Sequence, residues 1–470
     1  MISKRNSCFS AKYNMPETEI KKTKEHPDLY KKVIKGGFWV FALRIFTQLM
    51  SILRLAILAR ILSKTDFGLI GIALLLISIL GTITQTGFQA ALVQKKENIT
   101  PFLNTAWTTN IIRGIILYSL LYFIAPFAAK IKVPIEQYET ALAIIRVTGL
   151  SIIIGSLSNI GIVYFQKDLQ FNKTFQINSI SNLLGIAISI IIAIIYKSPW
   201  ALVAGRLTNT TISVLLSYIL HPFKPKLNFE KDKFLELWHF GRWVTGSSII
   251  GFFVNYGDDF FVWFFLGTEA LGLYQMAYRI AMIPADFGSS ILSKITFPAF
   301  SKVSNDIERL KKAYFKTYKF ASSFSIPSSV AILILSPIMI PLILGDKWIP
   351  AIILIQILTI KGTFLTLGAT RGPLFLSLNK PGIGTKFRFL RLITLSITIY
   401  PLCLLLELKG VCIAVTLSCL LPMAPAYNLA NKLLNATWKD IIESSKTAIL
   451  VGIITGLLSL AVKYVLNYFF

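Results

Sequence analysis

Long apolar runs dominate the chain from residue 38 almost to its end. Each run has about 20 or more residues, enough for an α-helix to cross a bilayer, and a helix satisfies its own backbone hydrogen bonds in lipid. Of the 470 residues 15% are charged, against about a quarter in soluble domains, and the mean hydropathy is +0.65. We therefore predict an all-α polytopic membrane protein. Its expected spans are 38–62, 67–93, 104–129, 139–165, 174–196, 199–220, 241–266, 270–300, 316–344, 350–378, 387–407, 410–434 and 446–468.

The two halves of this pattern share a framework 204 residues apart. Gly37-Phe38-Trp39-Val40 recurs as Gly241-Arg242-Trp243-Val244, and Phe67-Gly68-Leu69 recurs as Leu271-Gly272-Leu273. Such repeats build many transporters, whose substrate site lies where the repeats meet. We expect two six-helix lobes around a central cavity. The predicted parts are a basic cytoplasmic extension (1–35), an N-lobe (36–220), a cytoplasmic linker (221–239), a C-lobe (240–434) and an extra C-terminal helix (435–470).

The net charge of +26 follows the predicted topology. If residues 1–35 are cytoplasmic, every second loop is rich in Lys and Arg, whereas the alternate loops are short and carry few basic residues. The positive-inside rule then places the amino terminus in the cytoplasm, where basic loops meet anionic lipid headgroups. Membrane topology accounts for the charge, and nucleic acid is not an expected partner.

Polar residues mark one face of the first span in each half. Arg44, Thr47, Ser51 and Arg54 fall within an arc of about 80° at about 100° per residue. Polar side chains in a bilayer normally face the bundle interior or a watery cavity. The positions 204 residues later are Ser248, Gly251, Asn255 and Asp258, so the repeat preserves the polar face.

The second and eighth spans carry similar stripes. The first stripe consists of Ser78, Thr82, Gln85 and Gln89, and its counterpart consists of Met282, Asp286, Ser289 and Ser293, extended by Gln275 and Arg279. Four helices thus point polar faces toward one place, and we expect a shared cavity there. For the Ser and Thr residues, hydrogen bonding between helices is the simpler explanation.

The charged residues inside predicted spans are harder to explain as packing, because each costs roughly 2.5–3.5 kcal/mol at mid-bilayer on insertion scales if it faces lipid. Basic groups outnumber acidic ones there, which favours an anionic headgroup; Arg suits phosphate. We expect Arg60 and Arg206 to extend to the outer surface instead. The candidate cavity residues are Arg44, Ser51, Gln85, Arg113, Arg146, Asn255, Arg279, Lys361 and Arg371.

Acidic residues in the spans are candidates for a gate or for ion coupling. Arg54 and Asp258 occupy equivalent repeat positions with opposite charge, and we expect them to pair, with Asp259 nearby, when the cavity is closed to the outside. Asp286, near the middle of the eighth span, is a candidate for binding a coupling proton or sodium ion. No other cofactor is expected, and the four cysteines show no metal-ligand spacing.

Several short motifs are spread over the chain from residue 36 onward. Beside Gly37 to Trp39 they are Ala59-Arg60-Ile61-Leu62-Ser63, Asp66-Phe67-Gly68-Leu69, Thr86-Gly87-Phe88, Asp258-Asp259, Leu271-Gly272-Leu273-Tyr274 and Phe297-Pro298. On these motifs the chain resembles the polysaccharide transporter family, the O-antigen and colanic-acid flippase type of exporter. The resemblance implies two six-helix lobes, alternating access, and a sugar oligomer on undecaprenyl pyrophosphate as substrate. Members of this type often have fourteen spans, whereas one helix is predicted here after residue 434.

Three functions remain in competition. A flippase of the bacterial inner membrane would bind the diphosphate first through Arg44 or Arg113 and would serve O-antigen, capsule or exopolysaccharide synthesis, with membrane lipids and other polysaccharide-assembly proteins as partners. An ion-coupled multidrug or small-solute exporter shares the fold, but cationic drugs favour an acidic cavity. A glycan-assembly enzyme needs an external catalytic loop, and the chain offers neither that loop nor a nucleotide-binding or hydrolytic motif. We therefore expect a transporter and not an enzyme.

Overall fold

The computed structural model describes residues 46–469 apart from 96 and 169; some helical side chains, including 242–250 and 287–295, are outside the description. The described chain is helical almost throughout and contains no strand. Eight described helices are long and apolar enough to cross a membrane. The prediction of an all-α polytopic membrane protein is therefore confirmed. The extension 1–35, the motif at 37–40 and Arg44 lie outside the described residues.

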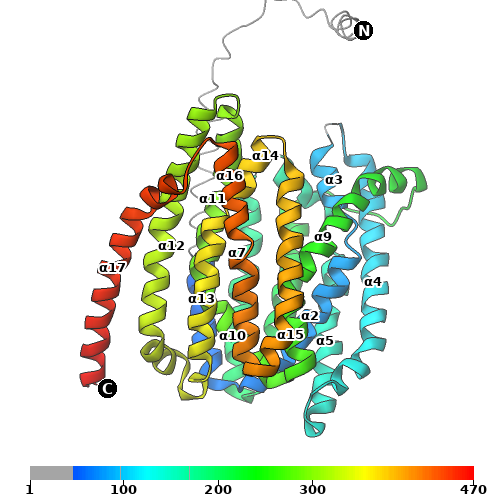
Figure 1. Ribbon diagram of the computed structural model, residues 1–470. Coiled ribbons are helices and arrows are strands. Elements are labelled where there is room, and N and C mark those ends of the chain that lie inside the picture. The colour runs from blue at the N-terminus through cyan, green and yellow to red at the C-terminus, as the bar shows by residue number, and fades with distance from the viewer. Residues whose placement is uncertain (1–45, 96, 169, 470) are drawn as a thin grey trace, which may run out of the picture.

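The helices form two groups. The first group holds a helix over 46–61, α2 (Lys64–Ile83), α3 (Phe88–Gln94), α4 (Thr100–Lys130), α5 (Tyr138–Ser156), α6 (Val163–Lys167), α7 (Phe171–Tyr196) and α8 (Trp200–Leu220). The second group holds α9 (Lys231–Leu266), α10 (Thr268–Ala281), α11 (Ile283–Val303), α12 (Ile307–Leu344), α13 (Ala351–Gly368), α14 (Arg371–Ser377), α15 (Pro381–Leu420), α16 (Met423–Leu433) and α17 (Trp438–Phe469). Figure 1 shows α17 beside α12 at the edge of the bundle.

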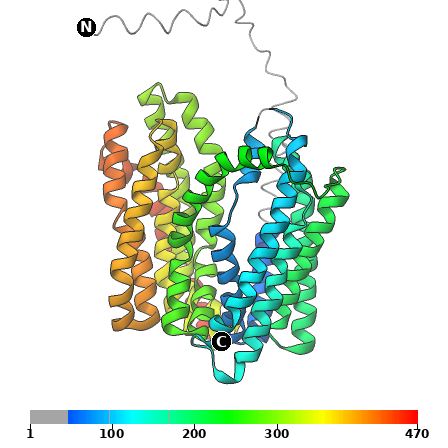
Figure 2. The same cartoon turned by 90° about the vertical axis from the view of Figure 1, so that its right-hand side faces the viewer.

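Figure 2 shows these groups on opposite sides, with the blue to teal helices of the first half at the right and the yellow to orange helices of the second at the left. The green helix α9 runs between them. The extended segment 221–230 joins α8 to α9, and the remainder of the predicted linker, 231–239, is the helical start of α9. We call the end of the bundle that carries the linker, uppermost in Figure 1, the linker end.

Several predicted single spans are broken helices. Interruptions separate α2 from α3, α5 from α6, α10 from α11, α13 from α14 and α15 from α16. In addition, α15 turns back on itself at Glu407, where φ is 51°. Backbone groups freed at a break inside a membrane protein need partners from neighbouring helices or side chains. At the α5–α6 break the buried side chain of Asn159 provides them, accepting from Gly161 N at 2.9 Å and donating to Phe223 O at 2.7 Å.

Positions related by the sequence repeat meet in a reciprocal contact between α2 and α10. A Cβ atom on Gly68 would overlap the carbonyl oxygen of Thr268, and a Cβ atom on Gly272 would overlap the carbonyl oxygen of Lys64. The two contacts are equivalent under the 204-residue offset found in the sequence, which relates Gly68 to Gly272 and Lys64 to Thr268. Such a self-complementary contact is the arrangement that a two-fold axis produces between identical subunits. The two halves therefore meet through equivalent surfaces here.

Further contacts join the halves at the end opposite the linker. The indole of Trp348, which follows α12, is fully buried, packs edge-on against Phe67 with ring centroids 5.5 Å apart, and donates to Ala59 O at 2.9 Å. Lys64 and Glu269 form an ion pair of 3.2 Å between α2 and α10. At the linker end, Lys95 after α3 pairs with Glu236 of α9. The halves are thus linked at both ends of the bundle.

Candidate functional site

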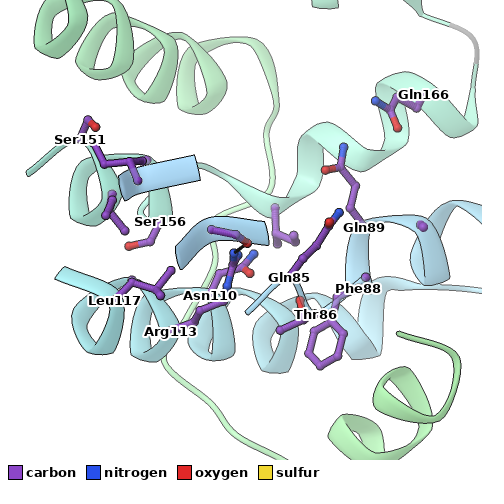
Figure 3. A pocket seen from close by; sticks show the side chains of 18 of the residues that line it. Gln85, Thr86, Phe88, Gln89, Asn110, Arg113, Leu117, Ser151, Ser156 and Gln166 are labelled. Atoms are coloured by element: carbon purple, nitrogen blue, oxygen red, sulfur yellow. Dashed lines mark hydrogen bonds between the residues drawn. The ribbon is translucent and has the colours of Figure 1, made fainter. Parts of the chain in front are cut away.

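A cavity of about 700 Å³ lies among the helices of the first half. Its described lining comes from α2, α3, α4, α5, α6 and α8, and Figure 3 shows it around the break between α2 and α3. Of the predicted cavity residues, Gln85 and Arg113 line it. We expected walls from both halves, whereas every described lining residue belongs to the first half.

Arg113 of α4 stabilises the end of α2 as well as facing the cavity. Its Nη2 atom donates to Gly81 O at 2.7 Å, and its Nε atom donates to Thr84 Oγ1 at 3.1 Å. The last carbonyls of a helix lack intrahelical donors, and a cation near that end is favourable. Arg113 therefore holds the α2 break in place, and its remaining N–H groups are available to a ligand because a guanidinium has five donors.

Three arginines from both halves form a cationic cluster beside this cavity. Arg54 lies within electrostatic range of Arg279 on α10 and of Arg206 on α8, and both repel it. Arg206, which we left out of the site, also lines the cavity while its side chain is exposed. An accumulation of positive charge inside a membrane protein suits a polyanion.

An acidic cluster lies in the second half. The carboxylate of Asp258 on α9 accepts from the Tyr274 hydroxyl at 2.6 Å, and Lys361 Nζ of α13 lies 3.9 Å from Asp258 Oδ2. Asp258 and Lys361 are 2% and 1% exposed. Lys361 Nζ also donates to the Tyr278 hydroxyl at 3.2 Å and lies 4.3 Å from the centroid of that ring. These contacts form an ion pair between α9 and α13, with each partner hydrogen-bonded to a tyrosine of α10.

Asp259 connects the acidic cluster with the arginines. Its Oδ1 atom accepts from Gln275 Nε2 at 3.0 Å, and it interacts electrostatically with Lys361 and Arg279. Gln275 reaches into space above Gly71, the residue 204 positions earlier, where a Cβ atom would lie 2.7 Å from Gln275 Oε1. Charged groups therefore continue from the first-half cavity, through the arginine cluster, to the acidic cluster.

The predicted pairing of Arg54 with Asp258 does not occur in the described structure. Asp258 pairs with Lys361, and Arg54 has arginines as its charged neighbours. The reason is that Asp258 is buried against α10 and α13, while Arg54 approaches Arg279 and α8. The assignment of these residues to a gate stays a prediction.

Other predicted residues lie outside these clusters. Ser51 is exposed and donates to Thr47 O of its own helix at 2.7 Å. Asn255 is exposed on α9, and Asp286 is exposed in the first turn of α11. Arg146 of α5 lies 3.8 Å from the centroid of the Tyr122 ring, and its buried Nε atom has no hydrogen-bond partner among the described residues.

Arg371 has a structural environment near the linker end. Its guanidinium lies 4.5 Å from the centroid of the Tyr427 ring, and its Nη1 atom donates to Met423 O at 3.4 Å. Arg60, which we left out of the site, donates to the carbonyls of Leu342 and Ile343 at the end of α12. Neither residue lines the cavity.

The profile of the family described as "Polysaccharide biosynthesis protein" matches residues 57–353, more than half of the chain. The chain belongs to this family. Among curated polysaccharide biosynthesis proteins, it is 24% identical over 361 residues to the lipopolysaccharide biosynthesis protein WzxC of Escherichia coli K12, covering 76% of this chain and 73% of that protein. It is also 24% identical over 353 residues to the teichuronic acid biosynthesis protein TuaB of Bacillus subtilis 168, covering 75% and 72%.

Solved structures place this polysaccharide biosynthesis protein in a known transporter fold. The lipid II flippase MurJ in an inward closed conformation matches with a TM-score of 0.71 at 17% identity, covering 90% of this chain and 98% of that one. An inward-facing multidrug resistance transporter of the MATE family matches with a TM-score of 0.63 at 14% identity, covering 83% and 94%. The fold is therefore that of these transporters.

Sequence reasoning missed several cavity residues of this family member. Asn110 lies three residues before Arg113 on the same face of α4, a spacing that could have revealed it. Gln166 of α6 lines the cavity because the chain breaks after α5. The glycines, serines and asparagine between residues 155 and 161 are the sequence signal that could have revealed this break. Arg206 is another of the missed cavity residues.

Proposed function

We propose that this protein moves a polyprenyl-diphosphate-linked oligosaccharide from the cytoplasmic to the outer leaflet of the bacterial inner membrane, for the synthesis of a surface polysaccharide. The carrying observation is the cluster of Arg54, Arg206 and Arg279 beside the cavity in a member of the polysaccharide biosynthesis protein family. Guanidinium groups bind phosphate through paired donors, and both relatives named above serve the synthesis of cell-surface polymers by their names.

The mechanism is alternating access. The linker end carries basic residues such as Lys224, Lys226 and Lys233, so the positive-inside rule assigns it to the cytoplasm. A diphosphate that enters from that end meets Arg113 and then Arg206, while the polyprenyl chain stays in lipid. Separation of the halves at the opposite end then releases the headgroup outside. The protein supplies binding and conformational change, and no step makes or breaks a covalent bond.

The acidic cluster is our candidate for ion coupling. Asp258 and Asp259 lie in α9, which runs between the two halves, and Asp259 interacts with Arg279 of the cationic cluster. A proton or sodium ion taken up by these carboxylates, or by Asp286, alters the charge that Arg279 experiences. The release of an anionic headgroup can be coupled to ion entry in this way.

Deletion of the gene tests the function directly. Cells without the protein are expected to accumulate the lipid-linked oligosaccharide on the cytoplasmic side and to lose the surface polysaccharide. The wild-type gene should reverse both effects.

A point mutation tests the role of the arginines. Arg206→Ala should lower the amount of surface polymer about tenfold or more, since a charge-assisted hydrogen bond contributes about 1.5–3 kcal/mol. Arg206→Lys should retain an intermediate level. Arg309→Ala, at an exposed position near the linker end, is the matched control. A normal lipid-linked pool with unchanged surface glycan contradicts the proposal and favours a drug exporter.

A further inference from the structure

The cavity of the first half contains more than a phosphate site requires. Apart from Arg113 and Arg206, its polar lining consists of side-chain amides and hydroxyls, contributed among others by Gln89, Asn110, Gln166 and Ser151. Figure 3 shows Ser151 and Ser156 on one side of the view and Gln89 and Gln166 on the other, with Asn110 and Arg113 between them. Neutral groups that can both donate and accept hydrogen bonds therefore surround the space.

These amides are not used to hold the helices together. Gln89, Asn110 and Gln166 make no side-chain hydrogen bond to any described residue, although polar side chains between membrane helices normally bond across the interface. By contrast, Arg113 in the same cavity is bonded to the α2 end. The unpaired amides face the cavity, where a polar ligand can reach them.

The break between α2 and α3 positions part of the cavity lining. Gly87 adopts φ of 67°, in the left-handed region, between α2 and α3. The turn at this residue brings Gln85, which precedes it, and Gln89, which follows it, into the wall of the same cavity. An uninterrupted helix over the predicted span 67–93 would not turn here. The broken span therefore shapes this wall.

We infer that this cavity is a carbohydrate subsite, which binds the first sugar rings of the lipid-linked oligosaccharide while the arginine cluster binds the diphosphate. Sugar hydroxyls both donate and accept hydrogen bonds, and side-chain amides also offer donors and an acceptor. The volume of about 700 Å³ lies within the roughly 300–1,000 Å³ typical of small-ligand sites. It accommodates a few sugar rings beside the diphosphate and leaves a longer glycan outside. The inference rests on the proposed function.

Two lipid probes separate the two parts of the site. Purified full-length protein in nanodiscs is titrated with undecaprenyl diphosphate and with the lipid-linked oligosaccharide extracted from the deletion strain. Gln89→Ala combined with Asn110→Ala should weaken binding of the oligosaccharide lipid at least fivefold and leave undecaprenyl diphosphate binding unchanged. Arg206→Ala should weaken both. Gln94 lies on the same helix α3 but outside the described lining. As the control, Gln94→Ala should change the affinity for neither lipid.

Chemical protection provides a second readout that does not depend on loss of affinity. In full-length protein with Cys8, Cys403, Cys412 and Cys419 replaced by Ser, Gln89→Cys should react with a maleimide, and the oligosaccharide lipid should slow this reaction while undecaprenyl diphosphate does not. Equal protection by both lipids, or an unchanged affinity of the double variant for the oligosaccharide lipid, overturns the carbohydrate subsite. Failure of the wild-type protein to bind either lipid overturns the proposed function itself.

Discussion

Lys361 and Asp258 face each other between α13 and α9 with Nζ and Oδ2 3.9 Å apart, and both side chains are almost completely buried. The removal of one partner from a buried pair leaves an uncompensated charge, which costs about 3–5 kcal/mol. We expect Lys361→Met to lower the thermal unfolding temperature in detergent strongly, and we expect Lys361→Met with Asp258→Asn to recover most of that loss. A double variant no more stable than Lys361→Met would show that the pair is not coupled.

Asp258 pairs with Lys361 in the structure, whereas the sequence repeat predicted a pair with Arg54. A mutational experiment distinguishes the two pairings. A double-mutant cycle should give a coupling energy above about 1 kcal/mol for Asp258 with Lys361 and close to zero for Asp258 with Arg54. A strong coupling with Arg54 would restore the predicted gate pair. In that case, the double charge swap Arg54→Asp with Asp258→Arg is expected to recover the transport that either single swap loses.

Ala substitutions at Gly68 and Gly272 should have similar effects, because their contacts are reciprocal. Each added methyl group meets a backbone carbonyl of the partner helix, and overpacking costs about 1–3 kcal/mol. Gly257→Ala on α9 is the control, because a Cβ atom there meets nothing within 4 Å. It should be neutral or slightly stabilising, since Ala is more favourable than Gly in a helix by about 1 kcal/mol. Unfolding temperatures of the three variants test this; a harmless Gly68→Ala would contradict the close approach.

His221 should make the linker end sensitive to mild acid. Burial lowers the pKa of His221, the positive charge of Lys173 lowers it further, and Asp168 partly opposes them. The unfolded chain, with a His pKa of about 6.5, then takes up the proton at a higher pH than the folded protein. Stability from this residue is complete above about pH 6.5 and declines as the pH falls from there through the folded-state pKa. Melting curves between pH 5 and 8 should show a weaker pH dependence for His221→Gln; identical curves refute the role.

Movement of the halves can be tested at Lys64 and Glu269, whose side chains form an ion pair of 3.2 Å between α2 and α10. In the cysteine-free protein, Lys64→Cys with Glu269→Cys should react with a short bifunctional thiol reagent and lose transport, because the end opposite the linker can no longer open. A reagent with a reducible spacer allows recovery to be measured. Either single cysteine with the same reagent is the control. Full transport in the cross-linked protein would refute opening at this end.

Much of the fold follows from apolar runs, because a bilayer permits few alternatives to a helix of about 20 residues. The broken spans were not predictable in the same way. No proline marks the break after Ile83, and its geometry depends on Arg113 from another helix. The polar stripes predicted Gln85, which lines the first-half cavity, whereas Arg206 was assigned to the surface because span boundaries do not reveal which neighbour a side chain meets.

The partner of Asp258 illustrates the same limit. The repeat suggested Arg54, since duplicated positions are equivalent in sequence, but Lys361 is the residue that meets it in space. Distances between helices far apart in the chain are set by packing, as at Gly68 and Gly272, where two small residues let the backbones approach. The offset of 204 residues relates these two glycines in sequence, but it specifies neither their close approach nor the charge pairs around them.

The reciprocal contacts of Gly68 and Gly272 bear on how the two halves would separate at the end opposite the linker. Both close contacts join the same two helices, α2 and α10. A movement of α10 away from α2 as a rigid body therefore breaks both contacts. We therefore expect separation of the halves at this end to break both glycine contacts in one step.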